Sequence, residues 1–162
     1  MGQVVSQEEI LRTRGEWKSA AKRVVFVVGC FDLLHPGHIR LLEQAHDYGN
    51  IVTVAVLSDE SVASSIETSP LSVNRPITSA SERAEIIAAL AAVDYAFEID
   101  IRTLPRFVAT FRPDAVVDGA EPIFRSPVVP AAQAARIEVI RIPLEPGHSS
   151  SRLIERIAQL RT

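Results

Sequence analysis

Two continuous apolar runs, at residues 24–28 and 51–57, most constrain what this chain can fold into. Both are rich in β-branched residues, and both are followed by sequence that is compatible with a helix. A strand that is apolar on both of its faces is typical of a parallel sheet with helices on both sides. The pattern therefore predicts an α/β protein built on an open parallel sheet.

Shorter segments continue this alternation of strands and helices along the chain. A capping box in Ser6-Gln7-Glu8-Glu9 predicts a first helix that runs to about Ala20 and packs on the outside of the domain. Right-handed crossovers would place helices on both faces of the sheet, so ligands would gather beyond the carboxyl ends of the strands. We expect further strands at residues 95–97, 115–117 and 137–142, and helices at 38–48, 81–90, 104–111 and 152–160.

The chain has 162 residues, which is the usual length of one domain. Its 47% of hydrophobic and 23% of charged residues are ordinary for a globular protein, and no internal repeat or long linker divides it. We therefore expect a single domain over residues 1–162, with an N-terminal helical extension at 1–21 and the catalytic core at 22–162.

Charge and cysteine content exclude several classes of function. A net charge of −3 argues against nucleic acid as the main partner, because such binding needs a basic face that neutralises many phosphates. The run at 24–28 is too short to cross a bilayer, so no membrane partner is expected. Cys30 is the only cysteine, which excludes an intrachain disulfide and suits a reducing compartment, so we expect a cytoplasmic location.

The segment that carries chemistry leaves the first strand and enters the first long helix of the core. It reads Gly29-Cys30-Phe31-Asp32-Leu33-Leu34-His35-Pro36-Gly37-His38. Backbone amides at the start of a helix are unpaired, and the helix dipole is positive there, so a phosphate against Gly37 and His38 would gain directed hydrogen bonds. Gly29 and Gly37 would let the backbone and the ligand approach each other closely.

His35 and His38 lie three residues apart across this helix start. That spacing can bring both imidazoles to one side and offer two donors to one phosphoryl group. The alternatives are surface or capping histidines and a zinc site. His46 is the nearest other histidine, and no metal site made by protein ligands alone is expected.

Two further segments are candidates for binding phosphate. Ser149, Ser150 and Ser151 follow Gly147 and bring hydroxyls and free amides to the start of the last helix; the alternative is simple capping by one serine. Arg75 could hold a phosphate with its guanidinium fork, or it could be a solvated loop arginine. It lies within residues 68–79, the longest stretch without clear periodicity, which could form a substrate lid.

These motifs resemble the cytidylyltransferase-like nucleotidyltransferase superfamily, whose signature joins a glycine, a Phe-Asp pair and a His-x-Gly-His motif after the first strand. Four segments are similar in particular to the heptose-1-phosphate adenylyltransferase domain of ADP-heptose synthases, and the resemblance covers residues 22–157. The four segments are Gly29 to His35, Asn74-Arg75-Pro76-Ile77, Glu82-Arg83 with Leu90-Ala91-Ala92-Val93-Asp94, and Pro146-Gly147-His148-Ser149-Ser150-Ser151.

The resemblance implies a Rossmann-like HxGH nucleotidyltransferase fold and a reaction in which a sugar phosphate attacks the α-phosphorus of ATP or CTP and releases pyrophosphate. It implies that His35 and His38 are catalytic, that Mg²⁺ assists, and that a small-molecule nucleotide and a sugar phosphate are the partners. Members of the family are often homodimers, so a second copy of the chain is a further candidate partner. The implied nucleotide-binding residues are Gly29, Cys30, Phe31, Asp32, Gly37, Ser149, Ser150 and Ser151.

The chain departs from the heptose enzymes at two places where they carry lysine. Asp118-Gly119-Ala120-Glu121 stands where they have Lys-Gly-Gly-Asp, and residues 64–73 contain no lysine. Because the only lysines are Lys18 and Lys22, a substitute cation must be an arginine, with Arg75, Arg125 and Arg152 as candidates. Candidates for contact with substrate or phosphate are Arg75, Asp118, Gly119, Glu121 and Arg125.

Three readings of this departure stay open. Asp118 could accept hydrogen bonds from the hydroxyls of a different acceptor, as in an enzyme similar to glycerol-3-phosphate cytidylyltransferase. The chain could instead bind a nucleotide in a regulatory role with weakened catalysis. A flavodoxin-like interaction domain is the third reading, but it leaves both glycine-flanked helix starts unexplained.

Overall fold

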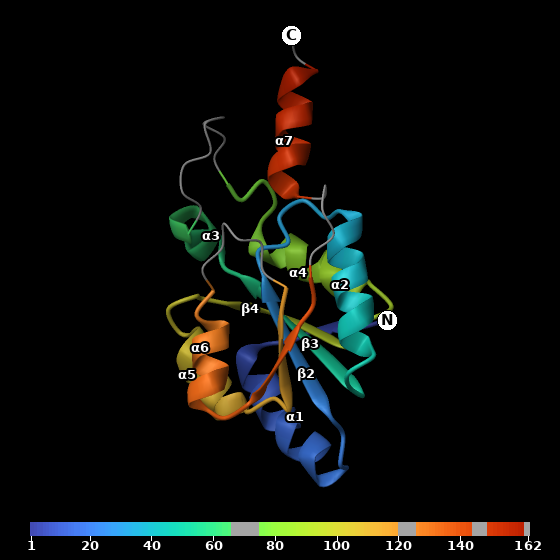
Figure 1. Cartoon of the computed structure of the whole chain (residues 1–162), viewed down its shortest axis with the longest axis vertical. Helices are drawn as coiled ribbons and strands as arrows, with labels where there is room; N and C mark the ends of the chain where they lie inside the picture. The colour runs from blue at the N-terminus through green and yellow to red at the C-terminus, as the bar shows by residue number, and fades with distance from the viewer. Residues whose placement is uncertain (66–74, 120–125, 144–148, 161–162) are drawn as a thin grey trace.

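The computed structural model describes residues 1–65, 75–119, 126–143 and 149–160, which form six strands and seven helices (Figure 1). The strands are β1 (Gln3–Val4), β2 (Val24–Gly29), β3 (Ile51–Leu57), β4 (Tyr95–Ile99), β5 (Ala115–Asp118) and β6 (Glu138–Arg141). The helices are α1 (Gln7–Ser19), α2 (Pro36–His46), α3 (Asp59–Ser65), α4 (Ala80–Ala88), α5 (Leu104–Phe111), α6 (Val128–Ala134) and α7 (Ser150–Gln159).

All six strands belong to one parallel sheet in the order β1-β4-β3-β2-β5-β6, which confirms the predicted fold class. Strand β2 is central, and its Val27 lies between Val54 of β3 and Val117 of β5. From β2 the chain extends the sheet first to one side and later to the other. In such sheets ligands bind beyond the carboxyl ends of the strands where the order reverses, here the ends of β2 and β5.

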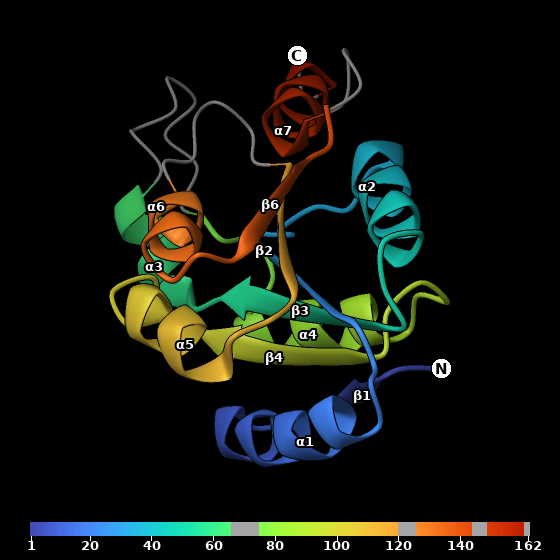
Figure 2. The same cartoon turned by 60° about the horizontal axis from the view of Figure 1, so that its bottom comes forward.

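Alternating side chains of β2 enter two separate cores. Val24, Phe26 and Val28 face a core that helices α1, α3, α5 and α6 close. Val25 and Val27 face the opposite core, which α2 and α4 close. Figure 2 shows α5 and α6 on one side of the sheet and α2 on the other. The predicted runs are therefore apolar throughout because helices bury both of their faces.

The first residues of the chain are part of the sheet as well as helical. β1 pairs with β4 at the sheet edge, and α1 follows it with the predicted capping box, in which the Ser6 hydroxyl accepts from the Glu9 amide at 3.1 Å and Glu9 accepts from the Ser6 amide at 2.7 Å. α1 buries Ile10 and Trp17 against the sheet. The helix was predicted, whereas the strand was missed because two residues carry no periodicity.

The predicted boundaries differ from the observed ones by at most two residues at either end of an element. α2 begins at Pro36, two residues before the predicted start, because proline has the backbone φ of a helix and needs no hydrogen-bond partner in the first turn. α3 and α6 were missed, since each has only seven residues and α6 contains a proline. Within the described part of the chain, no helix has the length and apolar character needed to cross a membrane.

Candidate active site

The loop between β2 and α2 is held in a conformation that few residues adopt. Phe31 has a φ of 52°, in the left-handed region, and its side chain is buried. A Cβ atom on Gly29 would lie 2.9 Å from the Phe31 ring, so only glycine fits there. Gly29 was predicted to make room for a ligand; in the structure it makes room for this ring.

The two histidines of the motif lie together, as their spacing predicted. His35 precedes the first residue of α2 with extended backbone angles, Pro36 and Gly37 begin the helix, and His38 follows in its first turn. The imidazole rings stack with their centroids 3.8 Å apart and their planes at 19°. On its other side the His38 ring meets the Phe31 ring, with centroids 5.2 Å apart and planes at 63°. Both imidazoles therefore lie at one helix start, where an anion is favoured.

His38 is an uncharged imidazole near neutral pH. Burial, and secondly the neighbouring His35, lower the pKa of His38 from 6.5 to about 3. Its Nδ1 atom is buried and has no hydrogen-bond partner in the part of the chain that the structure describes. A buried polar atom of this kind usually pairs with a ligand or with water. The described residues therefore leave the hydrogen-bonding capacity of Nδ1 unused, although protein atoms cover it.

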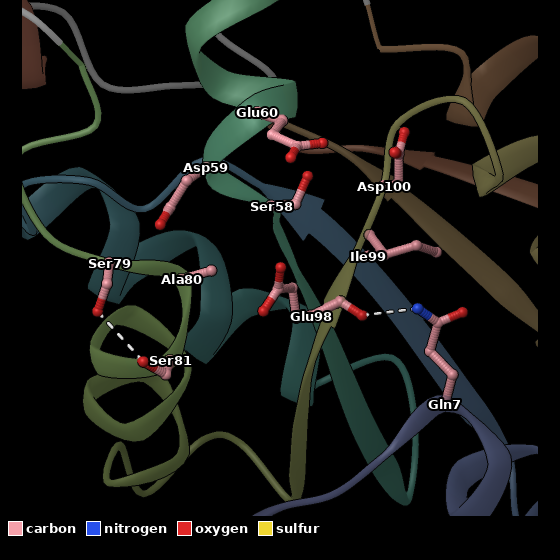
Figure 3. A pocket seen from close by; sticks show the side chains of 10 residues that line it. All are labelled: Gln7, Ser58, Asp59, Glu60, Ser79, Ala80, Ser81, Glu98, Ile99 and Asp100. Carbon is pink, nitrogen blue, oxygen red and sulfur yellow. Dashed lines mark hydrogen bonds between the residues drawn. The ribbon is translucent and has the colours of Figure 1, made fainter.

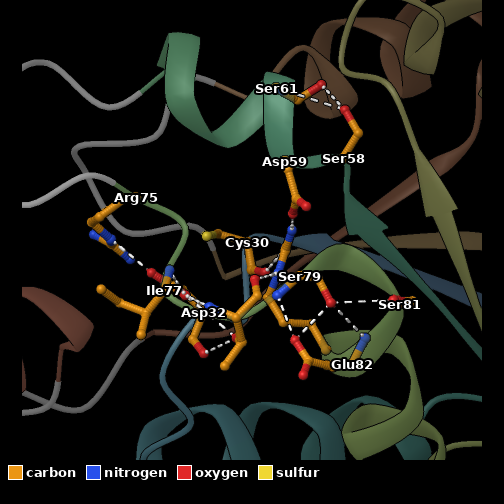
Figure 4. A network of polar contacts seen from close by, with 12 residues as sticks. Cys30, Asp32, Ser58, Asp59, Ser61, Arg75, Ile77, Ser79, Ser81 and Glu82 are labelled. Carbon is orange, nitrogen blue, oxygen red and sulfur yellow. Dashed lines mark hydrogen bonds and ion pairs between the residues drawn. The ribbon is translucent and has the colours of Figure 1, made fainter.

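Asp32 binds the protein rather than facing the site (Figure 4). Its side chain has no exposed surface and accepts from Arg75 Nε at 2.9 Å, from the Ile77 amide at 2.7 Å and from the Thr78 amide at 3.2 Å. The motif loop is thereby joined to residues 75–78, at the end of the predicted lid. Arg75 is ion-paired and only 10% exposed, which excludes the solvated alternative, and its contact with Asp32 is made through Nε.

Arg83 belongs to one of the segments that carry the family resemblance, but it was not predicted as a site residue. It lies on the buried face of α4 and donates from Nη1 to the Cys30 carbonyl, from Nε to the Thr78 carbonyl and from Nη2 to Asp59. The signal that could have identified it is an arginine among apolar residues at helical spacing. Ala80, Ala84 and Ile87 share that face of the helix.

The three serines at the start of α7 have different roles. The Ser149 hydroxyl accepts from the Arg152 amide at 3.2 Å, which is the simple capping contact. Ser150 is buried and donates from its hydroxyl to the Leu33 carbonyl at 2.9 Å, while Ser151 is partly buried. Ser150 therefore ties the start of α7 to the loop that precedes α2, and the two predicted phosphate sites lie side by side.

Asp118 and Gly119 lie at the carboxyl end of β5, next to β2. A Cβ atom on Gly119 would lie 2.3 Å from Leu41 Cδ1, which places Gly119 against α2 one turn beyond His38. Asp118 Oδ2 is 3.8 Å from Nε of Arg141, the residue opposite it on β6. Arg141 thus brings a positive charge that the sequence reasoning missed, since only the strand register reveals this neighbour.

Several predicted residues lie outside the described ranges. These are Glu121, Arg125, Asn74, Gly147 and the part of the proposed lid before residue 75. Arg152, another candidate cation, is exposed near the start of α7.

A cavity of about 590 Å³ lies beyond the ends of β3 and β4 (Figure 3). Four carboxylates line it, from Asp59, Glu60, Glu98 and Asp100. Carboxylates at this density repel a triphosphate. This cavity therefore does not suit a phosphate ligand. The two helix starts that carry the histidines and Ser150 suit it better.

Comparison with known proteins gives an independent view of the same region. A family model described as cytidylyltransferase-like matches residues 26–156. The chain is 40% identical over 155 residues to "Bifunctional protein HldE" of Koribacter versatilis, and 37% identical over 142 residues to the protein of the same name from Hyphomonas neptunium. These alignments cover 94% and 86% of this chain but only 31% and 28% of the relatives, so the chain spans about a third of their length.

Solved structures share the fold at lower sequence identity. The lipopolysaccharide core biosynthesis protein of Thermoplasma volcanium superposes with a TM-score of 0.60 at 23% identity, over 76% of this chain and 97% of that one. Pantothenate synthetase of Thermus thermophilus superposes with a TM-score of 0.61 at 18% identity, over 94% of this chain and 67% of that one. At such identities the similarity concerns the fold alone.

Proposed function

This chain belongs to the cytidylyltransferase-like family, and on that premise we propose that it transfers a nucleotidyl group from ATP to a sugar phosphate and releases pyrophosphate. The motif resemblance to ADP-heptose synthases, together with 40% identity to a relative named HldE, favours ATP as the donor. It also favours D-glycero-β-D-manno-heptose 1-phosphate as the acceptor.

The observation that carries the proposal is the hydrogen bond from Ser150 to the Leu33 carbonyl. It brings the start of α7 next to the loop that leads into α2, so two helix starts, each with the positive end of its dipole, lie near the histidine pair. A triphosphate has several charged groups along its length and can bind both helix starts at once. A single anion site would not need this arrangement.

The chemistry requires charge stabilisation more than proton removal. An oxygen of the acceptor's phosphate attacks the α-phosphorus, the bond from that phosphorus to the oxygen that bridges to the β-phosphate breaks, and pyrophosphate leaves with the electron pair. The acceptor is already anionic near neutral pH, so it needs no general base. His35 and His38 would donate hydrogen bonds to the oxygens where negative charge increases.

We infer that Mg²⁺ enters bound to the triphosphate. Among the described residues, no group of three or more His, Cys, Asp or Glu side chains is placed to hold a metal ion. The carboxylate within the motif, Asp32, already accepts from Arg75 and from two backbone amides. Phosphate oxygens are suitable ligands for Mg²⁺, which would neutralise part of the triphosphate charge.

Asp118 and Arg141 support a phosphorylated, hydroxyl-rich acceptor. The carboxylate can accept hydrogen bonds from sugar hydroxyls, and the guanidinium beside it can bind a phosphate. A carboxylate alone at this edge would repel such an acceptor, so the pair makes the departure from lysine compatible with the proposed substrate. A homodimer also stays a prediction by analogy with the family.

The test is pyrophosphate release from ATP or CTP with Mg²⁺, using heptose 1-phosphate and glycerol 3-phosphate as acceptors. We expect release with ATP and heptose 1-phosphate, and a loss of about a hundredfold or more in kcat for His38→Ala. Release only with CTP and glycerol 3-phosphate would identify the cytidylyltransferase alternative. Triphosphate binding without release for any sugar phosphate would exclude the transferase and favour the regulatory role.

A further inference from the structure

Arg83 is a buried charge that the proposed chemistry does not use. Its side chain has no exposed surface, because it lies on the face of α4 that covers the sheet. Burial of a charged group is strongly unfavourable unless its donors are all paired. An apolar residue at this position would cover the sheet without the cost of burying a charge. The hydrogen bonds that the arginine makes must therefore account for its presence.

The guanidinium joins three segments that are far apart in the sequence. Nη1 donates to the Cys30 carbonyl at 2.5 Å, Nε to the Thr78 carbonyl at 3.0 Å, and Nη2 to Asp59 Oδ1 at 2.5 Å. Figure 4 shows Cys30 near the middle of the polar network and Asp59 above it. Because the guanidinium is planar and rigid, it fixes the direction of the Cys30 carbonyl relative to α4.

That carbonyl belongs to the peptide group that leads into Phe31. A left-handed φ such as the 52° of Phe31 is unfavourable for a non-glycine residue, and it persists only where the surroundings impose it. On one side of Phe31 the peptide is held by Arg83 through Cys30. On the other side Asp32 is held by the Ile77 amide and by Arg75. The turn is therefore clamped at both ends.

The Phe31 ring carries this constraint to the histidine pair. It packs beside Gly29, where an added Cβ would lie 2.9 Å from it, and its ring meets that of His38 at a centroid distance of 5.2 Å. His38 in turn stacks on His35. A shift of the Cys30 carbonyl would rotate the Phe31 backbone and move the ring that borders His38.

We propose that Arg83 is a positioning residue for His38, which acts through the Cys30 carbonyl and the Phe31 ring without touching the substrate. Its effect on turnover rests on the proposed nucleotidyl transfer, whereas its effect on the geometry of His38 does not. Misplacement of a catalytic group by about 1 Å can slow a reaction as much as a hundredfold. Arg83 would therefore influence kcat from outside the site.

The variants that test this are Arg83→Lys, Phe31→Leu and their combination. Lysine keeps the charge and a hydrogen-bond donor but loses the planar fork, whereas an apolar residue would leave the Cys30 and Thr78 carbonyls without the donors of Arg83. Arg14→Lys is the matched control. Arg14 is also a mostly buried arginine that binds a backbone carbonyl, that of Arg112, and a carboxylate, that of Asp114, but at the opposite end of the sheet.

The first measurement is the NMR signals of the His38 ring in the protein without ligand, assigned with His38→Ala. We expect Arg83→Lys to move these signals in the same direction as Phe31→Leu, and to move them no further in the Phe31→Leu background. Arg14→Lys should leave them at the wild-type positions. Unchanged His38 signals in Arg83→Lys would overturn the proposal, whether or not the chain proves to transfer nucleotides.

The second measurement is steady-state kinetics with the substrates that the wild type uses. We expect each single variant to lower kcat about tenfold with KM for the triphosphate within about twofold, and the double variant to be no slower than about the worse single one. For Arg14→Lys we expect a lower melting temperature with kcat unchanged. The same result for Arg83→Lys would assign a purely structural role to Arg83. Multiplying losses in the double variant would also contradict the shared route.

Discussion

At the scale of single residues, His38 combines a position that favours a bound anion with a lowered pKa of its own. It lies at a helix start that favours an anion, and its burial and the neighbouring His35 disfavour its own positive charge by lowering its pKa. A neutral imidazole can still donate one hydrogen bond, and a bound phosphate would raise its pKa by supplying the missing counter-charge. His38 is therefore uncharged before the ligand binds and does not attract it from a distance, and its pKa would rise once a phosphate is bound.

The lowered pKa of His38 predicts how stability depends on pH. The unfolded chain takes up this proton near pH 6.5, whereas the folded chain does so only near pH 3, so folding becomes less favourable as the pH falls through that window. At pH 5 the difference is about 2 kcal/mol from this group alone. Urea unfolding of the wild type and of His38→Gln at pH 7.5 and pH 5 measures it. The variant should lose that much less than the wild type, and equal losses would show that His38 titrates normally.

At the scale of secondary-structure elements, close contacts fix how α2 sits over the sheet. Leu41 of α2 packs on the backbone of Gly119, just beyond β5, and the same helix carries His38 one turn earlier. The approach of this helix to the sheet thus depends on a residue without a side chain. In the sequence, Asp118-Gly119 stood out because Asp118 replaces a lysine of the heptose enzymes. The structure shows that Gly119 also has a packing role.

Two glycine-to-alanine changes separate this packing role from general chain flexibility. Gly119→Ala should lower the free energy of unfolding by about 1–3 kcal/mol, because the new Cβ would overlap the buried Leu41 side chain. Gly15→Ala should raise it by up to about 1 kcal/mol, because Gly15 lies within α1 with nothing within 4 Å of an added Cβ. Chemical denaturation checks both. A neutral Gly119→Ala would show that Leu41 moves aside freely.

At the scale of the whole molecule, the parts that sequence could predict are those with a local signal. The continuous apolar runs at 24–28 and 51–57 indicate strands buried on both faces, so the parallel sheet could be predicted. Ser6 and Glu9 form a capping box, so the start of α1 could be predicted as well. The pairing of His35 with His38 followed from their spacing. Contacts between distant segments carry no local signal, which is why the bonding partners of Arg83, Ser150 and Arg141 could not be predicted.

The same distant contacts predict that a bound nucleotide stabilises the molecule as a whole. If the triphosphate joins the starts of α2 and α7, Mg·ATP at a hundredfold excess over its Kd should add about 2.7 kcal/mol to the free energy of unfolding. Ser150→Ala removes the hydroxyl that ties α7 to Leu33 and leaves that carbonyl without this donor, so the rise in melting temperature with Mg·ATP should shrink.

Ser19→Ala is the matched control for this thermal-shift experiment, since its hydroxyl also donates to a backbone carbonyl, that of Gly15, but on α1. It should keep the full Mg·ATP shift even if its own melting temperature changes slightly. If Ser150→Ala keeps the full shift as well, the triphosphate does not depend on the placement of α7, and the second helix start is not part of its site. A smaller shift in Ser150→Ala alone would show that nucleotide binding depends on the contact between α7 and the motif loop.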